Sequence, residues 1–365
     1  MVAARSGPTV TARALPRPPA VARVLERIAA LARSQAMFEP GSRVLVAVSG
    51  GTDSVCLLHS LVRVRRLLRI EPVCFHFDHR LRPGSAADGA YARRQAERLG
   101  VAFVLREAGS SPERGESVEA WARAVRYEAL FRAMEDTGSA AAAVAHTMDD
   151  QAETVLLALL RGGGLESLAA MDPVNPPVVR PLLTTTRAET EAFCRALRLR
   201  PRRDPMNEDP RYMRAAVRHE VIPVLEERLG RNVRAALVRT AALLRRDSDL
   251  LERLAEEAAH DMMETAGTDR GIERRLRLGP LLEAPAPIAA RVIRGALLDL
   301  GVVPEAAHVA AVLDLASART GARISLPQEL IASRDREYVR LLRPSPRGQA
   351  PAQAPARDRR RPAGS

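Results

Sequence analysis

Short apolar runs and amphipathic stretches alternate along the first half of the chain. The apolar runs are residues 43–48, 72–77, 101–105 and 140–146, and stretches with helical spacing follow them at 56–68, 87–100, 117–138 and 150–164. Short apolar runs of this kind are typical of buried strands, and apolar residues three and four apart are typical of helices that cover a sheet. The alternation predicts an α/β fold with a doubly wound parallel sheet.

The pattern changes near residue 232, where long stretches rich in Arg, Leu, Ala and Glu begin. Helical spacing continues over 233–264 and returns at 287–301 and 305–317, and two short strands are indicated within 322–342. We therefore predict a bridging helix within 231–272 and a second, smaller and mainly helical domain at 273–343.

The chain has 365 residues, 46% of them apolar, which is enough for two domains. Its formal charge of +12 lies mostly in the ends: residues 1–23 carry +4 and residues 343–365 carry +5, which leaves +3 for 24–342. We predict disordered extensions at 1–23 and 344–365 and a catalytic domain at 24–230. Any surface for a polyanion within the folded body must therefore be a local patch.

Several classes of protein are excluded by composition. All 56 basic residues are arginine, so the chain has neither a Schiff-base lysine nor a Walker A loop. Cys56, Cys74 and Cys194 lie far apart without a C-x-x-C pair, which argues against a disulfide framework or a cysteine metal site. Apolar runs are too short to span a membrane, so we expect no membrane association and a cytoplasmic location.

The stretch SGGTDS follows the first predicted strand and opens a helix. Gly50 and Gly51 permit a tight turn whose N–H groups point inward, and the helix N-terminus beyond them favours an anion. Asp53 would repel a bound phosphate unless a divalent cation lay between them, which points to Mg²⁺. An ordinary turn in which Asp53 caps the helix is the alternative.

The hexapeptide matches the SGG-x-DS signature of the PP-loop ATP pyrophosphatases, which cleave ATP between its α and β phosphates to adenylylate a substrate. Within that group, FDHRLRPGS (77–85), EAWARAVRYEAL (119–130), residues 145–171, RPLL (180–183) and residues 203–225 resemble tRNA(Ile)-lysidine synthetases. The resemblance is strong over 40–230. It is weaker over 273–343, where it is to the substrate-binding domain of that family.

The resemblance implies a reaction in two steps on the isoleucine tRNA with a CAU anticodon. ATP first adenylylates the 2-oxo group of the wobble cytidine, and the ε-amine of free L-lysine then displaces AMP to form lysidine. ATP and Mg²⁺ are the implied cofactors, and the tRNA and free lysine are the implied partners. A homodimer is compatible with the sequence.

Lysine titrates near 10.4, so presenting its neutral amine at neutral pH costs about 4 kcal/mol. Asp150 and Glu153 share one face of the helix that follows the fourth strand, where one carboxylate could pair with an ammonium group and another accept a proton. Either could instead simply cap the helix.

The predicted site residues fall into three groups. The catalytic set is Asp53, His146, Asp150, Glu153 and Arg126; the ATP set is Ser49, Gly50, Gly51, Thr52, Asp53, Ser54, Asp78 and His79; the lysine and tRNA set is Asp149, Gly163, Arg214 and Arg218. Asp53 is also the predicted metal ligand.

Some of these assignments have an ordinary structural alternative. Arg126 and Arg218 lie on amphipathic helices, where a solvated face is equally plausible, and Gly163 could belong to a plain helix stop. His76 and His79 lack a nearby third ligand, so we favour nucleotide contact or loop structure over zinc.

Three other functions compete with lysidine formation. A PP-loop tRNA thiolation enzyme would require a cysteine pair, which the sequence lacks. Amidating relatives would generally bring a glutaminase, and their pattern does not match HTMDDQAET. A non-catalytic tRNA-binding module with a decayed loop is disfavoured by the intact SGGTDS and acidic stretches.

Overall fold

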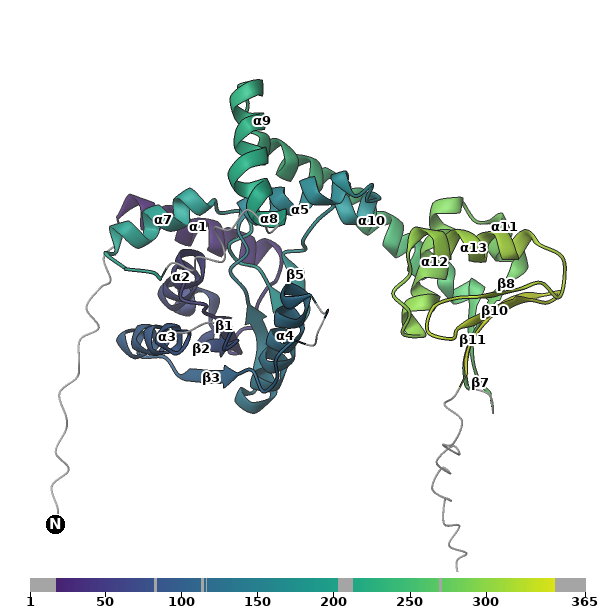
Figure 1. Ribbon diagram of the computed structural model, residues 1–365, viewed down its shortest axis with the longest axis horizontal. Helices are drawn as coiled ribbons and strands as arrows, with labels where there is room; N and C mark the ends of the chain where they lie inside the picture. Colours follow the sequence, from purple (N-terminus) through teal and green to yellow (C-terminus); the bar gives the residue numbers. More distant parts are fainter. Residues whose placement is uncertain are drawn as a thin grey trace, which may run out of the picture. The chain divides into compact units, whose positions relative to one another are not determined.

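The computed structural model describes residues 18–81, 84–112, 115, 117–202, 213–268 and 271–344. Most of the two predicted extensions, residues 1–17 and 345–365, lies outside the described residues. The chain divides into two compact units after Arg245, and each is described here by itself (Figure 1).

The first unit is built on a six-stranded sheet with the order β3-β2-β1-β4-β6-β5. Its strands are β1 (Arg43–Ala47), β2 (Glu71–Asp78), β3 (Phe103–Glu107), β4 (Ser139–Ala143), β5 (Val174–Asn175) and β6 (Val178–Val179). All neighbours pair in parallel except β5 and β6. The predicted doubly wound parallel sheet is confirmed, with one antiparallel strand added at its edge.

Helices cover both faces of this sheet. Those that pack on it are α1 (Pro19–Ser34), α2 (Thr52–Leu68), α3 (Ala86–Leu99), α4 (Val118–Thr137) and α7 (Arg187–Ala196). The unit also contains α5 (Met148–Leu160), α6 (Leu165–Leu168), α8 (Met213–Ala216), the π-helical turn η2 (Val217–Val221) and α9 (Ile222–Leu229).

The alternation of side chains along β1 explains the two layers. Val44 and Val46 point to the face that α1, α2, α3 and α7 cover, whereas Leu45 between them packs with Trp121 and Leu130 of α4 on the other face. Because successive strand residues face opposite sides, a strand buried on both faces is apolar throughout. Figure 1 shows α1, α2 and α7 on one side of the strands and α4 on the other.

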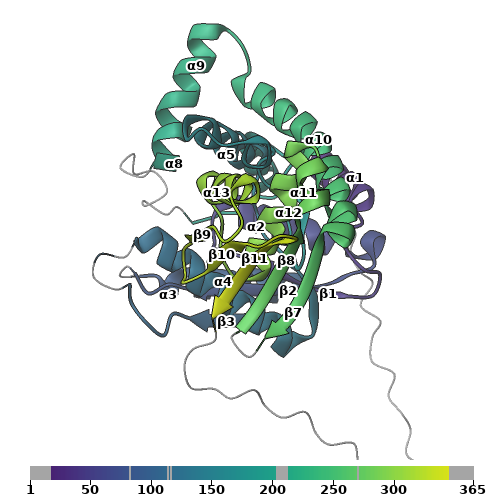
Figure 2. The ribbon, with the colours of Figure 1, turned by 90° about the vertical axis from the view of Figure 1, so that its right-hand side faces the viewer.

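The second unit combines helices with a five-stranded sheet. The long α10 (Val233–Met262) leads into it, and α11 (Leu278–Glu283), α12 (Ala286–Asp299) and α13 (Ala306–Ser317) follow. Strands β7 (Met263–Thr268), β8 (Gly271–Arg277), β9 (Arg323–Ser325), β10 (Ile331–Arg334) and β11 (Tyr338–Pro344) pair antiparallel in the order β7-β8-β11-β10-β9, side by side in Figure 2.

Two expectations differ from the structure. Helix α1 begins at Pro19, inside the range predicted to be disordered, because Pro19 suits the first helical turn and Val21 is fully buried. The predicted strand pair of the second domain is part of a larger sheet: β7 and β8 were missed because charged side chains interrupt their alternation and β7 follows α10 directly. Among the described residues, no helix is both long and apolar enough to cross a membrane.

Candidate active site

The SGGTDS stretch forms the turn between β1 and α2. Gly50 has φ +94°, a left-handed conformation that only glycine adopts without strain, and Gly51 is the N-cap of α2. The Ser54 hydroxyl donates to the Gly51 carbonyl oxygen at 2.9 Å, and its oxygen lies 3.2 Å from that of Ser49. The turn therefore lies at the carboxyl end of β1, as predicted, with the N-terminus of α2 directly behind it.

Asp53 lies in the first turn of α2 and contacts α7. Its carboxylate accepts a hydrogen bond from the Thr190 hydroxyl and lies 3.5 Å from Nε of Arg187. Burial raises the pKa of Asp53 above its usual value, although Thr190 and Arg187 oppose that shift. Asp53 does not cap its own helix by a side-chain hydrogen bond, so the alternative that it is merely a cap is not supported.

Asp149 and Asp150 begin α5 after the fourth strand, and Glu153 follows one turn later. Thr147 and Asp150 form a reciprocal capping box, in which the Asp150 carboxylate accepts the Thr147 N–H at 2.8 Å. Capping is thus one real role of Asp150, but it uses only Oδ2 of the carboxylate. The other oxygen, Oδ1, faces two arginines.

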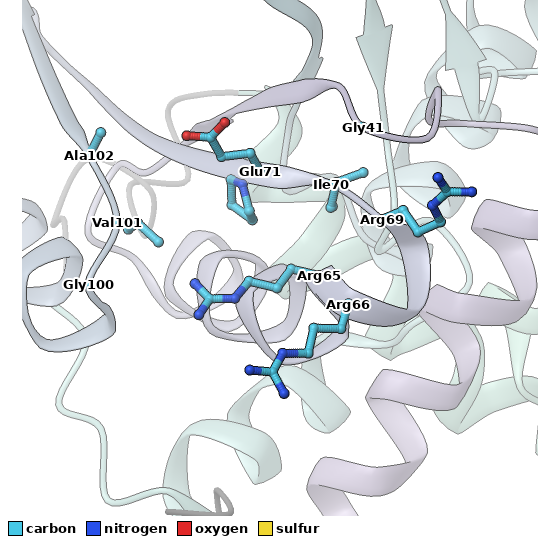
Figure 3. Close-up of a pocket in the computed structure, with 10 residues that line it drawn as sticks. Gly41, Arg65, Arg66, Arg69, Ile70, Glu71, Gly100, Val101 and Ala102 are labelled. Carbon is cyan, nitrogen blue, oxygen red and sulfur yellow. The ribbon is translucent and has the colours of Figure 1, made fainter. Parts of the chain in front are cut away.

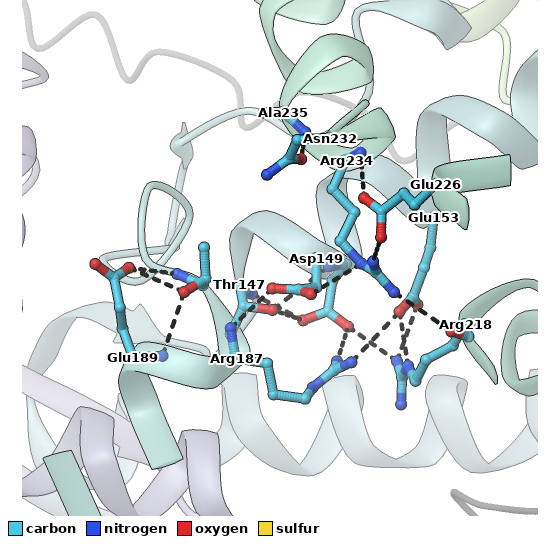
Figure 4. A network of polar contacts seen from close by, with 12 residues as sticks. Thr147, Asp149, Glu153, Arg187, Glu189, Arg218, Glu226, Asn232, Arg234 and Ala235 are labelled. Atoms are coloured by element: carbon cyan, nitrogen blue, oxygen red, sulfur yellow. Dashed lines mark hydrogen bonds and ion pairs between the residues drawn. The ribbon is translucent and has the colours of Figure 1, made fainter. Parts of the chain in front are cut away.

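Three arginines from different elements converge on these acids (Figure 4). The contacts are Arg187 Nη2 to Asp150 at 3.0 Å, Arg187 Nη1 to Glu153 at 3.5 Å, Arg218 to Glu153 at 2.6 and 2.9 Å, Arg218 to Asp150 at 3.1 Å, and Arg234 to Asp149 at 3.2 Å. Glu153 is only 2% exposed. A buried carboxylate of this kind is tolerated because the guanidinium fork of Arg218 pairs with both its oxygens.

Arg187 also affects the charge state of Asp150. Burial alone would raise its pKa, but Arg187, the Thr147 N–H and other neighbours outweigh burial and hold the pKa below its usual value. Asp150 is therefore ionised at neutral pH.

His146 lies between β4 and α5, and its Nδ1 accepts a hydrogen bond from Nε of Arg180 at 3.3 Å. Burial lowers the pKa of His146 to about 4. Asp150 opposes this shift, while the charges of Arg180, Arg126 and Arg214 reinforce it. The imidazole is consequently neutral at physiological pH and sits beside a group of arginines.

Arg126 and Arg214 thus lie within electrostatic reach of His146. Arg126 projects from α4, its guanidinium 5.5 Å from the ring centre of Tyr127, and Arg214 lies on α8. Within the described parts of the chain, no ion pair joins Arg126 to an acid. Its contact with an anion stays a prediction.

Asp78 is the last residue of the neighbouring strand β2, and His79 follows it. The Asp78 side chain is buried and accepts the backbone N–H of Arg80 at 2.8 Å, and the His79 ring lies edge-on to Phe77 with 4.7 Å between ring centres. The chain topology places both at the same sheet edge as Ser49–Ser54, so their contact with ATP stays a prediction.

Gly163 has a structural role as well. Gly162 (φ +70°) ends α5, and the N–H groups of Gly162 and Gly163 donate to the carbonyls of Leu159 and Ala158 at 3.0 and 2.8 Å, which is a Schellman cap. A Cβ on Gly163 would lie 2.9 Å from the Ala158 oxygen. This end of the 13-residue α5 is about 20 Å from the acids at its start.

A cavity of about 430 Å³ lies at the opposite edge of the sheet (Figure 3). It is lined by Arg65, Arg66 and Arg69 near the end of α2 and by the start of β2. None of the predicted site residues lines it, so the candidate site is the polar cluster at the carboxyl edge and not this cavity.

Comparison with known proteins identifies the family of the chain. The family of the PP-loop domain matches residues 22–225, and the TilS substrate binding domain matches residues 276–340. A tRNA(Ile)-lysidine synthase from Leifsonia xyli is 40% identical over 277 residues, which are 76% of this chain and 82% of that protein. The chain belongs to the tRNA(Ile)-lysidine synthase family. The resemblance drawn from its motifs is confirmed.

Members of the tRNA(Ile)-lysidine synthase family differ in length. A family member from Thermus thermophilus is also 40% identical over 311 residues, but the match covers 84% of this chain and only 58% of that protein. A solved structure, the U34-tRNA thiolase NcsA from Methanococcus maripaludis with its [4Fe-4S] cluster, aligns with TM-score 0.52 and 15% identity over 62% of this chain and 80% of that one. This second likeness shows the shared fold alone.

The one acidic side chain of the turn, Asp53, fits a magnesium ion better than a metal held by protein ligands alone. No group of three or more His, Cys, Asp or Glu among the described residues is placed to hold a metal ion. This suits Mg²⁺ in a lysidine synthase, because Mg²⁺ commonly binds through one or two carboxylates and completes its shell with water and substrate phosphates. Asp53, beside the N–H groups of the turn, is the carboxylate that fits.

Sequence reasoning missed four contributors: Arg180, Arg187, Thr190 and Arg234. Arg180 stood within the RPLL motif, which was a usable signal. Arg187, Thr190 and Arg234 reach the site only through the packing of α7 and α10, and in a chain with 56 basic residues no local pattern distinguished the two arginines.

We predict that His146 makes the folded chain sensitive to acid. Its pKa is near 4 when folded and near 6.5 when unfolded, so the unfolded chain binds more protons in this window and stability falls as pH falls. Relative to His146→Gln, the wild type should lose up to about 3 kcal/mol of unfolding free energy from pH 7 to pH 4. Urea denaturation of both proteins checks this, and a difference that does not vary with pH would contradict it.

We predict that Gly163→Ala destabilises the chain because its Cβ would collide with the Ala158 carbonyl. The expected loss is about 1–3 kcal/mol in thermal or urea unfolding. Gly164→Ala is the matched control, since nothing lies within 4 Å of a Cβ there. Equal stability of the two variants would show that the steric account of Gly163 is wrong.

Proposed function

We propose that this chain catalyses the ATP-dependent ligation of free L-lysine to the wobble cytidine of isoleucine tRNA with a CAU anticodon, releasing AMP and pyrophosphate. Its membership of the lysidine synthase family supports this reaction. The observation that carries the proposal is that Asp53 of the phosphate-binding turn and the acids of α5 are bridged by Arg187. The residues for nucleotide and amine thus form one site.

In the first step, the turn Ser49–Ser54 receives the triphosphate. Its N–H groups, hydroxyls and the N-terminus of α2 favour the negative charge that develops on the pyrophosphate as it leaves. Mg²⁺, held by Asp53 and the phosphates, would neutralise that charge further. The cytidine 2-oxo group attacks the α-phosphorus, forming the adenylate, and pyrophosphate departs.

In the second step, the lysine amine forms a C–N bond at cytosine C2 while the C–O bond to AMP breaks. Asp150 is the favoured partner for an ammonium group of the substrate, because its low pKa keeps it ionised. The amine that attacks must first lose a proton, for which the neighbouring carboxylates are the available acceptors. His146 can hydrogen-bond to the base without adding charge, since its imidazole is neutral.

The tRNA phosphates require cations at this edge of the sheet. Arg126 on α4 and Arg214 on α8 both lie near His146, and each guanidinium suits a phosphate contact. We assign residues 24–230 to catalysis, the α10 region to a bridge, and 273–343 to tRNA binding, where the TilS substrate binding domain matches.

The cysteines argue against thiolation. Cys56, Cys74 and Cys194 are all buried and unpaired. Burial raises the pKa of both Cys74 and Cys194 to about 12 and that of Cys56 well above its usual value. Sulfur transfer requires an accessible thiolate, which none of these residues provides.

We predict that AMP release from ATP requires both lysine and the isoleucine tRNA transcript with cytidine at the wobble position. Chromatography of labelled nucleotides measures this, with omission of each substrate as the control. Release that instead depends on a sulfur donor would favour thiolation, and no release under any condition would favour a bare binding module.

We also predict that Asp53→Asn lowers adenylylation at least about 100-fold, the scale seen when a transition-state charge loses its partner. Binding of tRNA, measured by filter retention, should stay within about twofold of the wild type because Asp53 contacts the nucleotide and not the tRNA. Asp247→Asn, at an exposed position of α10, is the control. Retained turnover in Asp53→Asn would contradict the Mg²⁺ role.

A further inference from the structure

Arg187 is the residue on which the acids of the site converge. Its guanidinium lies 3.5 Å from Asp53, 3.0 Å from Asp150 and 3.5 Å from Glu153. Its backbone N–H also donates to Asp149 Oδ2 at 2.8 Å. One residue at the start of α7 therefore touches all four carboxylates, which come from two different helices.

The three acids that the Arg187 guanidinium contacts differ in how many other partners they have. Glu153 has a second, closer partner in Arg218, and Asp150 is also held by Arg218 and by its capping bonds. The contact of Arg187 with Asp53 is long, and Asp53 retains the Thr190 hydroxyl as another donor. Arg187 can therefore leave Asp53 without leaving a buried carboxylate unpaired.

A divalent cation on Asp53 would meet Arg187 at close range. Mg²⁺ binds carboxylate oxygen at about 2.1 Å, so it and the guanidinium would share one carboxylate and repel each other. Four carboxylates face three arginines here, and Arg234 also pairs with Glu226. The cluster therefore carries a net negative charge that favours a further cation, but a cation bound to Asp53 has to take the place of the Arg187 guanidinium there.

We propose that Arg187 is an internal counter-cation that competes with Mg²⁺ for Asp53 and is exchanged for it when the nucleotide binds. This rests on the proposed role of Asp53 in holding the metal. After the exchange, Arg187 keeps its contact with Asp150 and Glu153. The same arginine thus contacts the predicted metal ligand on α2 and the acids on α5.

The test is the affinity of the nucleotide-free chain for Mn²⁺, measured by electron paramagnetic resonance. Arg187→Met should bind Mn²⁺ roughly tenfold more tightly than the wild type, because a cation next to the ligand carboxylate is gone. Arg187→Lys keeps the charge and should stay near the wild type. Arg187→Gln keeps hydrogen-bond donors but no charge, and it should show the same increase in Mn²⁺ affinity. It replaces Arg187→Met in the test if the methionine variant does not fold.

Three controls identify the source of the gain. Arg195→Met lies on the same helix, pairs with Glu191 on the surface and should leave affinity unchanged. Arg234→Met also removes one positive charge from the cluster, beside Asp149. Because Arg234 does not contact Asp53, the Mn²⁺ affinity should increase clearly less in this variant. In the Asp53→Asn background, the gain from Arg187→Met should vanish.

The proposal is overturned if Arg187→Met does not bind Mn²⁺ more tightly than the wild type, or if Arg234→Met increases the Mn²⁺ affinity by as much. It is also overturned if Arg187→Met still increases the Mn²⁺ affinity when Asp53 is replaced by Asn. The proposed function is tested by a separate measurement, the release of AMP by the wild type in the presence of lysine and tRNA. Normal release together with any of these three results would leave lysidine formation standing and remove the role of Arg187 as a competitor.

Discussion

The interaction on which the site depends is the pairing of four neighbouring carboxylates with arginines from α7, η2 and α10. Like charges at such short range are stable only when each has a cation beside it, and removing one cation leaves a charge uncompensated. Glu153, at 2% exposure, shows the constraint most clearly, because both its oxygens are held by Arg218. The charge balance of the site therefore depends on the packing of three separate elements.

The parallel sheet explains why this balance involves the nucleotide turn. Strands β1 and β4 are neighbours, so the segments that follow them emerge side by side at one edge. Asp53 comes from the first and the α5 acids from the second. Helix α7 packs against α2 and carries Arg187 to both. The fold thus places a phosphate-binding turn beside an acidic patch, which is the arrangement that joining a nucleotide-activated base to an amine requires.

The parallel sheet, the turn and the acids of α5 were predictable from sequence because each depends on a local pattern of residues. The strand carrying Val44–Val46 is apolar throughout, the glycines at 50–51 mark the turn, and Asp150 and Glu153 share a helical face. The α7 and α10 arginines were not predictable, since Arg187 lies 134 residues from Asp53 in sequence and meets it only through tertiary packing. Gly163 takes part in the cap of α5, and its predicted contact with tRNA stays a prediction. The sheet of the second unit was underestimated because charged residues mask the alternation of β8.

The account depends on the SGGTDS turn binding the triphosphate through a metal held by Asp53. Isothermal titration calorimetry of the purified chain with ATP tests this most directly, with Mg²⁺ present in one titration and removed by chelator in the other. The account predicts saturable binding of one nucleotide with Mg²⁺ and much weaker binding without it. Absence of binding in both titrations, or equal affinity in the two, would contradict it.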